Sequence, residues 1–411
     1  MGQFLANMAH VEYAVKITIE IVFFPRRTTV FKLVIPFFRI WLLALICVSP
    51  SIFAQTKLIG EPRAKTTQGK IADKPLFRDP VYDGAADPVL CWNRKEKRWF
   101  MFYTNRRANV PDTVGVSWVH GTAIGIAESS DGGATWKYRT TAQIDYQKGK
   151  DTYWAPEVIE HDGTYHMYLT YVPGIFKDWN APRDILHLTS KNLIEWKYQS
   201  TLKLSSNRVI DACVMQLSDG TWRMWYNNET DRKSIYYADS KDLYAWHDKG
   251  KAVGARGEGP KVFRWKGHIW MVVDVWSGLS VYRSKDALTW QLQKDNLLEK
   301  PGKGMDDQVK GGHPDVVVSG ERAHLFYFTH PGRRGRDANK DTYEQRRSSI
   351  QVVELEFKDG RLVCDRDKPT RILLKPPVPS NKIVFNSKIV SQWSVLFWQD
   401  RSRKFEAVYV Y

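Results

Sequence analysis

Cysteine is scarce in this chain of 411 residues, which contains four cysteines in all. Three of them, Cys91, Cys213 and Cys364, lie beyond residue 54, and this odd, sparse set argues against a disulfide framework. No CxxC pair is present, so thiolate binding of a metal is equally unsupported. We expect the three cysteines to be small buried hydrophobic residues. The sequence also lacks any helical pattern of consequence.

Long hydrophobic runs are missing as well. The run Ile40 to Val48 is too short and badly flanked for a transmembrane span. Basic residues precede it and SIFA follows it, which is the basic, apolar, small-residue order of a secretory signal peptide. We therefore predict that residues 1–54 are a signal peptide with a superfluous start before about Pro25, cleaved after Ala54. The predicted location is secreted or periplasmic.

Acidic residues are outnumbered, with 45 Asp and Glu against 61 Lys and Arg, a formal net charge of +16. Residues 1–54 carry +3 of this, which leaves +13 on the remainder. Such a surplus attracts polyanions over distance. Nucleic acid is disfavoured as the partner, because the protein is predicted to be exported and has no recognisable nucleic-acid-binding motif. Two interpretations stay open: an anionic polysaccharide partner, sulfated or uronate-bearing, or a solvated basic surface.

Aromatic residues, by contrast, are abundant, with 17 Trp, 19 Tyr and 18 Phe. A short aromatic-rich strand recurs five times, as RWFMFYT, TYHMYLT, TWRMWYN, HIWMVVD and AHLFYFT, at spacings of 66, 57, 47 and 55 residues. Strand-like units at such spacings predict the blades of a β-propeller rather than a helical solenoid. A propeller gathers one edge of every blade around an axis, so residues distant in sequence can share one pocket.

A second repeat supports the first. Turns rich in Ser, Asp and Lys precede Trp136, Trp196, Trp246 and Trp290, and each turn follows a strand of small and β-branched residues. We predict an all-β, five-bladed propeller over residues 76–374, closed by segments from both ends of the sequence, with 349–357 as a candidate closing strand. Residues 55–75 are expected to be a linker or strap, and the tail 375–411 an edge strand or an appendage.

Three acids stand beside conformationally special residues, each shortly before one of the aromatic strands: Asp87 in GAADPVL, Asp211 in RVIDACVM and Glu258 in RGEGPKVF. If each lies on the innermost strand of its blade, all three approach the axis at one end. Hydrolysis of a glycosidic bond needs one carboxylic acid and one carboxylate, about 6.5 to 9.5 Å apart when water attacks directly. Taken singly, such acids are more often turn residues, but their matched positions favour a shared site.

Several motifs in order resemble glycoside hydrolase family 43 and its five-bladed relatives: the Asp-Pro at 87–88, WAPEV, VIDACVM with DGTWRMWY, GEGPKVFRWKGHIWM, and GGHPDVVV with YFTHPG. The resemblance covers about residues 76–332. It implies an inverting mechanism with Asp87 as general base, Asp211 as pKa modulator and Glu258 as general acid. In the family the middle acid is usually followed by Pro, whereas here Ala212 follows it.

The same resemblance draws attention to His313 in GGHPD, because the family often has a Gly-His pair near a bound cation or water at the axis. His313 is thus a candidate substrate or metal residue beside a structural Ca²⁺, although a packing role is the alternative and Ca²⁺ prefers oxygen ligands. Asp315 and His330 are lesser candidates. The mechanism itself requires no cofactor.

Further residues are candidates for binding sugar. Trp154 could stack on a sugar ring while Glu157 accepts hydroxyl hydrogen bonds, or both could merely shape the second blade. Trp118 and His120, on a loop before a blade-one strand, are candidates for a rim subsite.

The sequence thus predicts a secreted glycoside hydrolase that cleaves plant or algal oligo- or polysaccharides by inversion. Exo action is preferred because the blade loops are long enough to close one end of the pocket. One alternative resembles family 117, which releases anhydro-galactose units but uses a His in the acid role, where this chain has Glu258. Another is a glycan phosphorylase, against which Asp87 speaks. A non-catalytic glycan-binding propeller is the third.

Overall fold

The computed structural model describes residues 69–146, 149–338 and 340–377, and three further strands at 382–385, 394–399 and 405–410. The predicted signal peptide and residues 55–68 of the predicted linker lie outside the described residues. Within the described residues the one α-helix is α1 (Tyr343–Arg346), and two short 3-10 turns accompany it, η1 (Ser117–Val119) and η2 (Gly335–Asp337). None of the helices in these ranges is long and apolar enough to span a bilayer.

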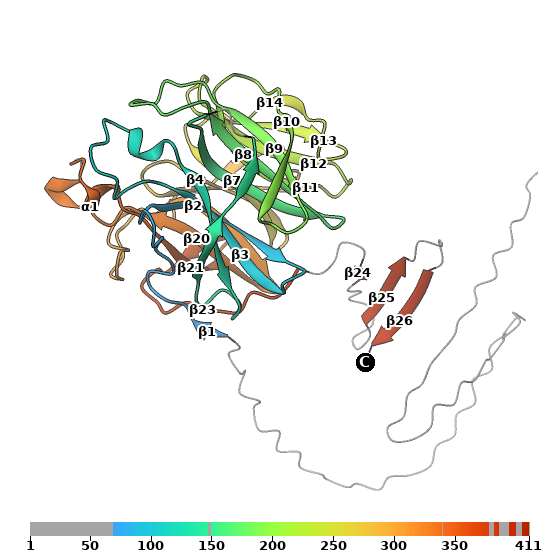
Figure 1. Ribbon diagram of the computed structural model, residues 1–411. Coiled ribbons are helices and arrows are strands. Elements are labelled where there is room, and N and C mark those ends of the chain that lie inside the picture. Colours follow the sequence, from blue (N-terminus) through green and yellow to red (C-terminus); the bar gives the residue numbers. More distant parts are fainter. Residues whose placement is uncertain are drawn as a thin grey trace, which may run out of the picture. The chain divides into compact units, whose positions relative to one another are not determined.

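Five antiparallel sheets form the blades, and the predicted five-bladed β-propeller is confirmed (Figure 1). Blade one comprises β2 (Ala85–Asn93), β3 (Arg98–Asn105), β4 (Ala123–Ser129) and β5 (Lys137–Thr141). Blade two comprises β7 (Thr152–His161), β8 (Thr164–Val172), β9 (Asp184–Ser190) and β10 (Glu195–Thr201), and a fifth strand, β6 (Gln143–Asp145), pairs parallel with β10. Blade three comprises β11 (Val209–Gln216), β12 (Trp222–Asn228), β13 (Ser234–Ser240) and β14 (His247–Val253). Blade four comprises β15 (Glu258–Trp265), β16 (His268–Asp274), β17 (Leu279–Ser284) and β18 (Gln291–Leu292). Blade five comprises β19 (Gly312–Ser319), β20 (Arg322–Thr329), β21 (Ser349–Lys358) and β22 (Arg361–Cys364).

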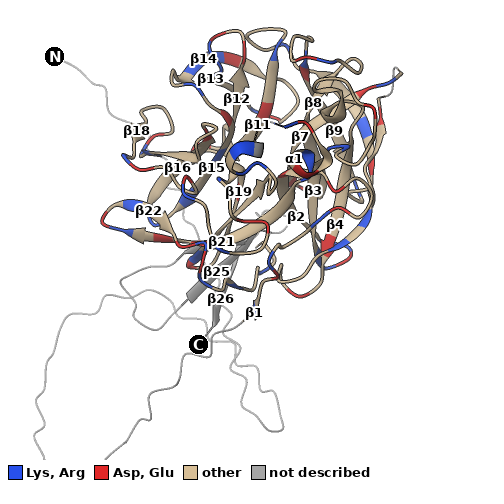
Figure 2. Cartoon of the chain, turned by 90° about the vertical axis from the view of Figure 1, so that its left-hand side faces the viewer, with Lys and Arg blue, Asp and Glu red and all other residues tan. Residues whose placement is uncertain are grey.

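The first strand of each blade is the innermost one. β2, β7, β11, β15 and β19 are each in contact with the first strands of the neighbouring blades, so together they close a ring. In Figure 2 the five sheets surround a common centre, and α1 lies on the end of the propeller that faces the viewer. The axis is therefore lined by first strands alone, which is the condition that the predicted site required.

The recurring aromatic strands are the second strands of the blades, and their central residues are buried: Met101, Met167, Met224, Met271 and Phe326 are each 0% exposed. The tryptophans that follow the turns begin the outer strands. Trp196, for example, meets Phe102 of blade one edge-on at 5.9 Å, and Trp290 meets Trp225 of blade three at 6.2 Å. These tryptophans therefore pack between neighbouring blades, in arrangements that aromatic pairs favour.

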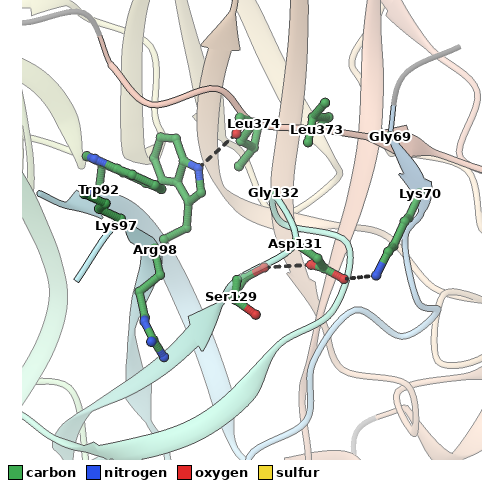
Figure 3. Close-up of a pocket in the computed structure, with 12 residues that line it drawn as sticks. Gly69, Lys70, Trp92, Lys97, Arg98, Ser129, Asp131, Gly132, Leu373 and Leu374 are labelled. Atoms are coloured by element: carbon green, nitrogen blue, oxygen red, sulfur yellow. Dashed lines mark hydrogen bonds and ion pairs between the residues drawn. The ribbon is translucent and has the colours of Figure 1, made fainter. Parts of the chain in front are cut away.

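Both ends of the described propeller take part in closing the ring. β1 (Lys70–Ile71) lies within the segment predicted as a linker or strap, and it pairs antiparallel with β23 (Arg371–Ile372). Figure 3 shows this region, where a cavity of about 490 Å³ is enclosed by β1, blade one and the segment after β23. The indole N–H of Trp99 donates to the carbonyl of Leu374 at 3.2 Å, and Lys70 lies 3.3 Å from Asp131.

The predicted closing strand at 349–357 has a different place. It forms most of β21, which lies inside blade five between β20 and β22. Its run of β-branched residues reflects burial on both sides within that blade. Within the tail, β24 (Lys382–Phe385), β25 (Ser394–Gln399) and β26 (Phe405–Val410) pair antiparallel as a separate three-stranded sheet. The tail was expected to be an edge strand or an appendage, and its described strands pair with one another rather than with a blade.

Candidate active site

The five innermost strands share one irregularity near their starts. Each strand shifts register there, and the residue at the shift has a positive φ: Asp87 (53°), Ala155 (39°), Asp211 (60°), Gly259 (55°) and His313 (39°). Such a bulge bends the strand and re-aims the side chain next to it. Pro follows four of the five. Aligned on this position, the motifs ADP, WAP, IDA, EGP and GHP form a repeat that sequence reasoning could have found.

Contacts between neighbouring bulges bring the predicted acids together. The backbone N–H of Gly259 donates to Asp211 Oδ2 at 3.0 Å. A Cβ added at Gly259 would lie 2.8 Å from the ring of His313, and that ring places Nδ1 3.5 Å from Asp87 Oδ1. The residues form a chain around the axis from Asp211 through Gly259 and His313 to Asp87. Because Glu258 immediately precedes Gly259, all three predicted carboxyl groups lie at the same end of the propeller axis.

Asp87 is 5% exposed and lies between two basic groups. Arg106 donates from one guanidinium nitrogen to both carboxylate oxygens, at 3.0 and 3.1 Å, and His313 lies on another side. Burial raises the pKa of Asp87. The charges of Arg106 and His313 and the hydrogen bonds from Thr104 and Arg106 together lower it by more than burial raises it, so the pKa of Asp87 lies below its ordinary value. Asp87 is therefore a carboxylate at neutral pH, as a general base must be.

Asp211 has the opposite electrostatic environment. It is 6% exposed, and its pKa is raised well above the ordinary value, first by burial and then by the negative charges of Glu258 and Asp87. Its backbone N–H donates to the hydroxyl of Thr170 at 3.1 Å, which helps to hold the bulge. Two carboxyl groups with pKa values moved apart by their surroundings are typical of acid–base sites.

Glu258 is the most accessible of the three acids, with a side chain 25% exposed. The indole N–H of Trp276 donates to its Oε1 at 3.0 Å, and Lys233 Nζ lies 3.4 Å from its Oε2. Trp276 holds this position with a φ of 58°, a left-handed conformation that is strained for an aromatic residue. The acid is therefore held by two side chains that the sequence did not identify.

A fourth carboxyl group, Asp274, lies beside Glu258 and also escaped the sequence analysis. It ends β16, directly opposite Glu258 in the strand register. Its two oxygens accept the backbone N–H groups of Trp276 and His313, both at 2.8 Å. Burial and the charge of Glu258 raise the pKa of Asp274 to about 7. It thus connects blade five to the segment that carries Trp276.

Two residues beyond the bulges, the first strands of blades two, four and five contribute a buried ion triad. Lys261 Nζ lies 2.9 Å from Glu157 Oε2 and 2.8 Å from Asp315 Oδ1. The two carboxylates also accept backbone N–H groups, Glu157 from Val214 and Asp315 from Leu90. The triad therefore links all five blades just below the acids. Glu157 is 3% exposed and fully engaged there, so its predicted role in accepting sugar hydroxyls does not fit this conformation.

The remaining predicted sugar contacts are also buried. Trp154 is 8% exposed, donates its indole N–H to the carbonyl of Val119 at 2.6 Å and packs near Arg183. Trp118 is 5% exposed and His120 is 0% exposed, and both belong to the packed wall between blades one and two. They were expected at the rim, but long loops fold over them, so they present no ring face to a ligand in this conformation.

His313 has a partly exposed side chain, and it faces Asp87 rather than a set of oxygen ligands. In the described ranges, no three or more His, Cys, Asp and Glu side chains are grouped in a way that could hold a metal ion. Two residues further along the first strands, the carboxylates of Glu157 and Asp315 are both paired with the ammonium of Lys261. The donor set around His313 therefore does not fit the Ca²⁺ site that the resemblance implied. His330, the lesser candidate, touches Arg106 at 3.2 Å.

With this geometry in view, comparison with solved structures identifies the fold as the five-bladed propeller of glycoside hydrolases. A thermostable family-43 glycoside hydrolase is 19% identical with a TM-score of 0.53, over 73% of this chain and 99% of its own. A family-43 enzyme from Xanthomonas citri complexed with xylotriose is 11% identical with a TM-score of 0.52, over 71% and 92%. A family-43 β-1,3-galactosidase with galactodeoxynojirimycin is 14% identical with a TM-score of 0.51, over 72% and 97%. No family model and no curated protein matches the sequence.

Proposed function

We propose that this protein is a secreted glycoside hydrolase that cleaves oligo- or polysaccharides by direct attack of water, with inversion at the anomeric carbon. The observation that carries this proposal is the convergence of Asp87, Asp211 and Glu258 at one end of the propeller axis, each on an innermost strand. The similar structures include enzymes solved with xylotriose and with galactodeoxynojirimycin, which supports a saccharide as the ligand.

In the proposed mechanism Asp87 is the general base. Its carboxylate stays ionised because Arg106 and His313 oppose the effect of burial, and it accepts a proton from the attacking water. Glu258 is the general acid that protonates the leaving oxygen, since it is the most exposed of the three and is held in place by Trp276. Asp211, the proposed pKa modulator, is buried beside Glu258 and orients it through the adjacent backbone of Gly259.

Exo action is the further part of the proposal. The segment between β20 and β21, which carries α1, lies at the end of the propeller that holds the acids: Tyr343 Oη donates to Asp83 Oδ2 at 2.5 Å, and Ser348 bridges to Gly84, just before β2. A segment at that end supports a substrate pocket that is closed on one side. Such a pocket admits the end of a saccharide chain but not its middle. Secretion rests on the signal peptide predicted from the sequence, and fractionation of cells expressing the full chain tests it.

The deciding experiment compares Asp87→Asn and Glu258→Gln with the unaltered protein on a panel of plant and algal oligosaccharides. Loss of a positioned acid or base costs about 10²- to 10⁴-fold in kcat, while binding measured by calorimetry persists. Glu321→Gln is the matched control, because its side chain is 90% exposed. NMR of the first product formed should show the inverted anomer.

Two results would refute the proposal. Turnover equal to the control in both variants would remove these acids from the mechanism. Saccharide binding without any turnover in the unaltered protein would favour the glycan-binding alternative.

A further inference from the structure

A basic hollow of about 500 Å³ lies beside the proposed general acid, lined by Arg232, Lys233, Gly254 and Arg256. Arg232 and Lys233 stand in the turn between β12 and β13, while Gly254 and Arg256 belong to the link between β14 and β15. The end of that link runs directly into Glu258, the first residue of β15. The hollow is thus built by blade three and by the segment that delivers the acid.

Two of the three basic side chains of this hollow have no ion-pair partner among the described residues. Lys233 pairs with Glu229 at 2.5 Å and lies 3.4 Å from Glu258. Arg232 and Arg256 are exposed, and no carboxylate of the described residues lies within ion-pair distance of either. The nearest acid in the turn, Asp231, is engaged by Lys251 at 2.6 Å. Two guanidinium groups are therefore free to bind an anion.

One of these groups is held in a defined place relative to the acid. The guanidinium carbon of Arg256 lies 4.5 Å from the ring centre of Trp276, a cation–π contact. The indole N–H of the same Trp276 donates to Glu258 at 3.0 Å. A single side chain thus fixes both the proposed acid and Arg256, so the anion position and the position of the leaving oxygen are coupled.

From this arrangement we infer that the hollow binds a carboxylate or sulfate group on the leaving-group side of the scissile bond, and that the substrate is an acidic oligosaccharide. The inference rests on the proposed function, because the general acid by definition stands on the leaving-group side. Guanidinium groups bind carboxylate and sulfate through paired hydrogen bonds, which suits Arg232 and Arg256. The surplus of basic residues in the chain would draw such a substrate in.

The test uses binding in an Asp87→Asn background, so that no probe is consumed. Calorimetry compares two matched pairs of probes: trigalacturonate with its methyl ester, and a κ-carrageenan tetrasaccharide with its desulfated form. We expect the charged member of at least one pair to bind about 10- to 100-fold more tightly than its neutral partner. The first pair reports a carboxylate and the second a sulfate.

Adding Arg256→Ala or Arg232→Ala to this background should remove most of that preference, while binding of the neutral partner changes less than about twofold. Arg264→Ala is the matched control, since Arg264 is an exposed arginine on β15, the strand that begins with Glu258, and its guanidinium contacts the carbonyl of Gln216. Circular dichroism melts confirm that each variant is folded.

The outcomes separate this inference from the proposed function. Equal affinity within both pairs, no binding of any probe, or an equal loss in the Arg264→Ala control would overturn the anion site. Arg256→Ala and Arg232→Ala variants that keep the full preference for the charged probe would do the same while leaving the proposed hydrolase intact. Charge-dependent binding that requires Arg256, in a protein that turns over none of the probes, would support the anion site and count against hydrolysis.

Discussion

Replacing Lys261 by Met tests how the ion triad holds the first strands of the blades together. The ammonium of Lys261 lies 2.9 Å from Glu157 and 2.8 Å from Asp315, and those two residues are 3% and 2% exposed. Met has a similar length and fills the same space, so the substitution removes the charge while conserving most of the volume. It leaves two buried carboxylates without a counter-ion.

The expected loss is large. Removing one partner of a buried ion pair costs about 3 to 5 kcal/mol, a substantial part of the roughly 5 to 15 kcal/mol of stability typical of a folded protein. Burial already raises the pKa of Glu157, and the charge of Lys261 is the first influence that opposes it. Without Lys261 the folded-state pKa of Glu157 rises further above its unfolded value, so the variant loses stability as pH rises. The loss should therefore be greater at pH 8 than at pH 5.

Urea unfolding followed by tryptophan fluorescence measures this at both pH values. Lys266→Met is the control, because Lys266 pairs with Glu321 at 2.5 Å at the surface, where such a pair contributes less than about 1 kcal/mol. The triple variant Glu157→Gln, Lys261→Met, Asp315→Asn should recover much of the loss, since it leaves no charged group in the triad. A Lys261→Met variant as stable as the control, or a loss that does not change with pH, would refute the reasoning.

Three further predictions concern the acids. In Arg106→Met, loss of the guanidinium should raise the pKa of Asp87 and move the acid limb of the kcat/KM profile upward by about one pH unit or more, and an unmoved limb would contradict this. Trp276→Phe removes the N–H donated to Glu258 and should lower kcat about tenfold with little effect on KM, so steady-state kinetics with unchanged kcat would count against it. Because the pKa of Asp274 is raised to about 7, its carboxyl group stays protonated in the folded protein between about pH 4 and 7, where the unfolded chain has lost that proton. The free energy of unfolding therefore falls as pH rises through this range, by up to about 1.4 kcal/mol per pH unit. Asp274→Asn should flatten that slope in urea titrations, and parallel slopes would exclude the effect.

The sequence by itself determined the blades. The aromatic strands centred on residues such as Met167 and Met224, and the turns before Trp196 and Trp246, are local patterns, since a hairpin and its turn lie within a few tens of residues. They predicted the fold class and the number of blades, and both are confirmed. They also led to the expectation that Asp87, Asp211 and Glu258 lie on innermost strands, where the structure has them.

The tertiary structure alone decided which charges meet. Lys261 pairs with Glu157 across 104 positions, and Arg106 touches His330 across 224, contacts that no local pattern encodes. Burial of Trp118 and His120 depends on loops that fold over them from other parts of the chain. A side chain's pKa and accessibility depend on the blades beside it, so the fold could be predicted from local repeats whereas the electrostatics of the site required the closed ring.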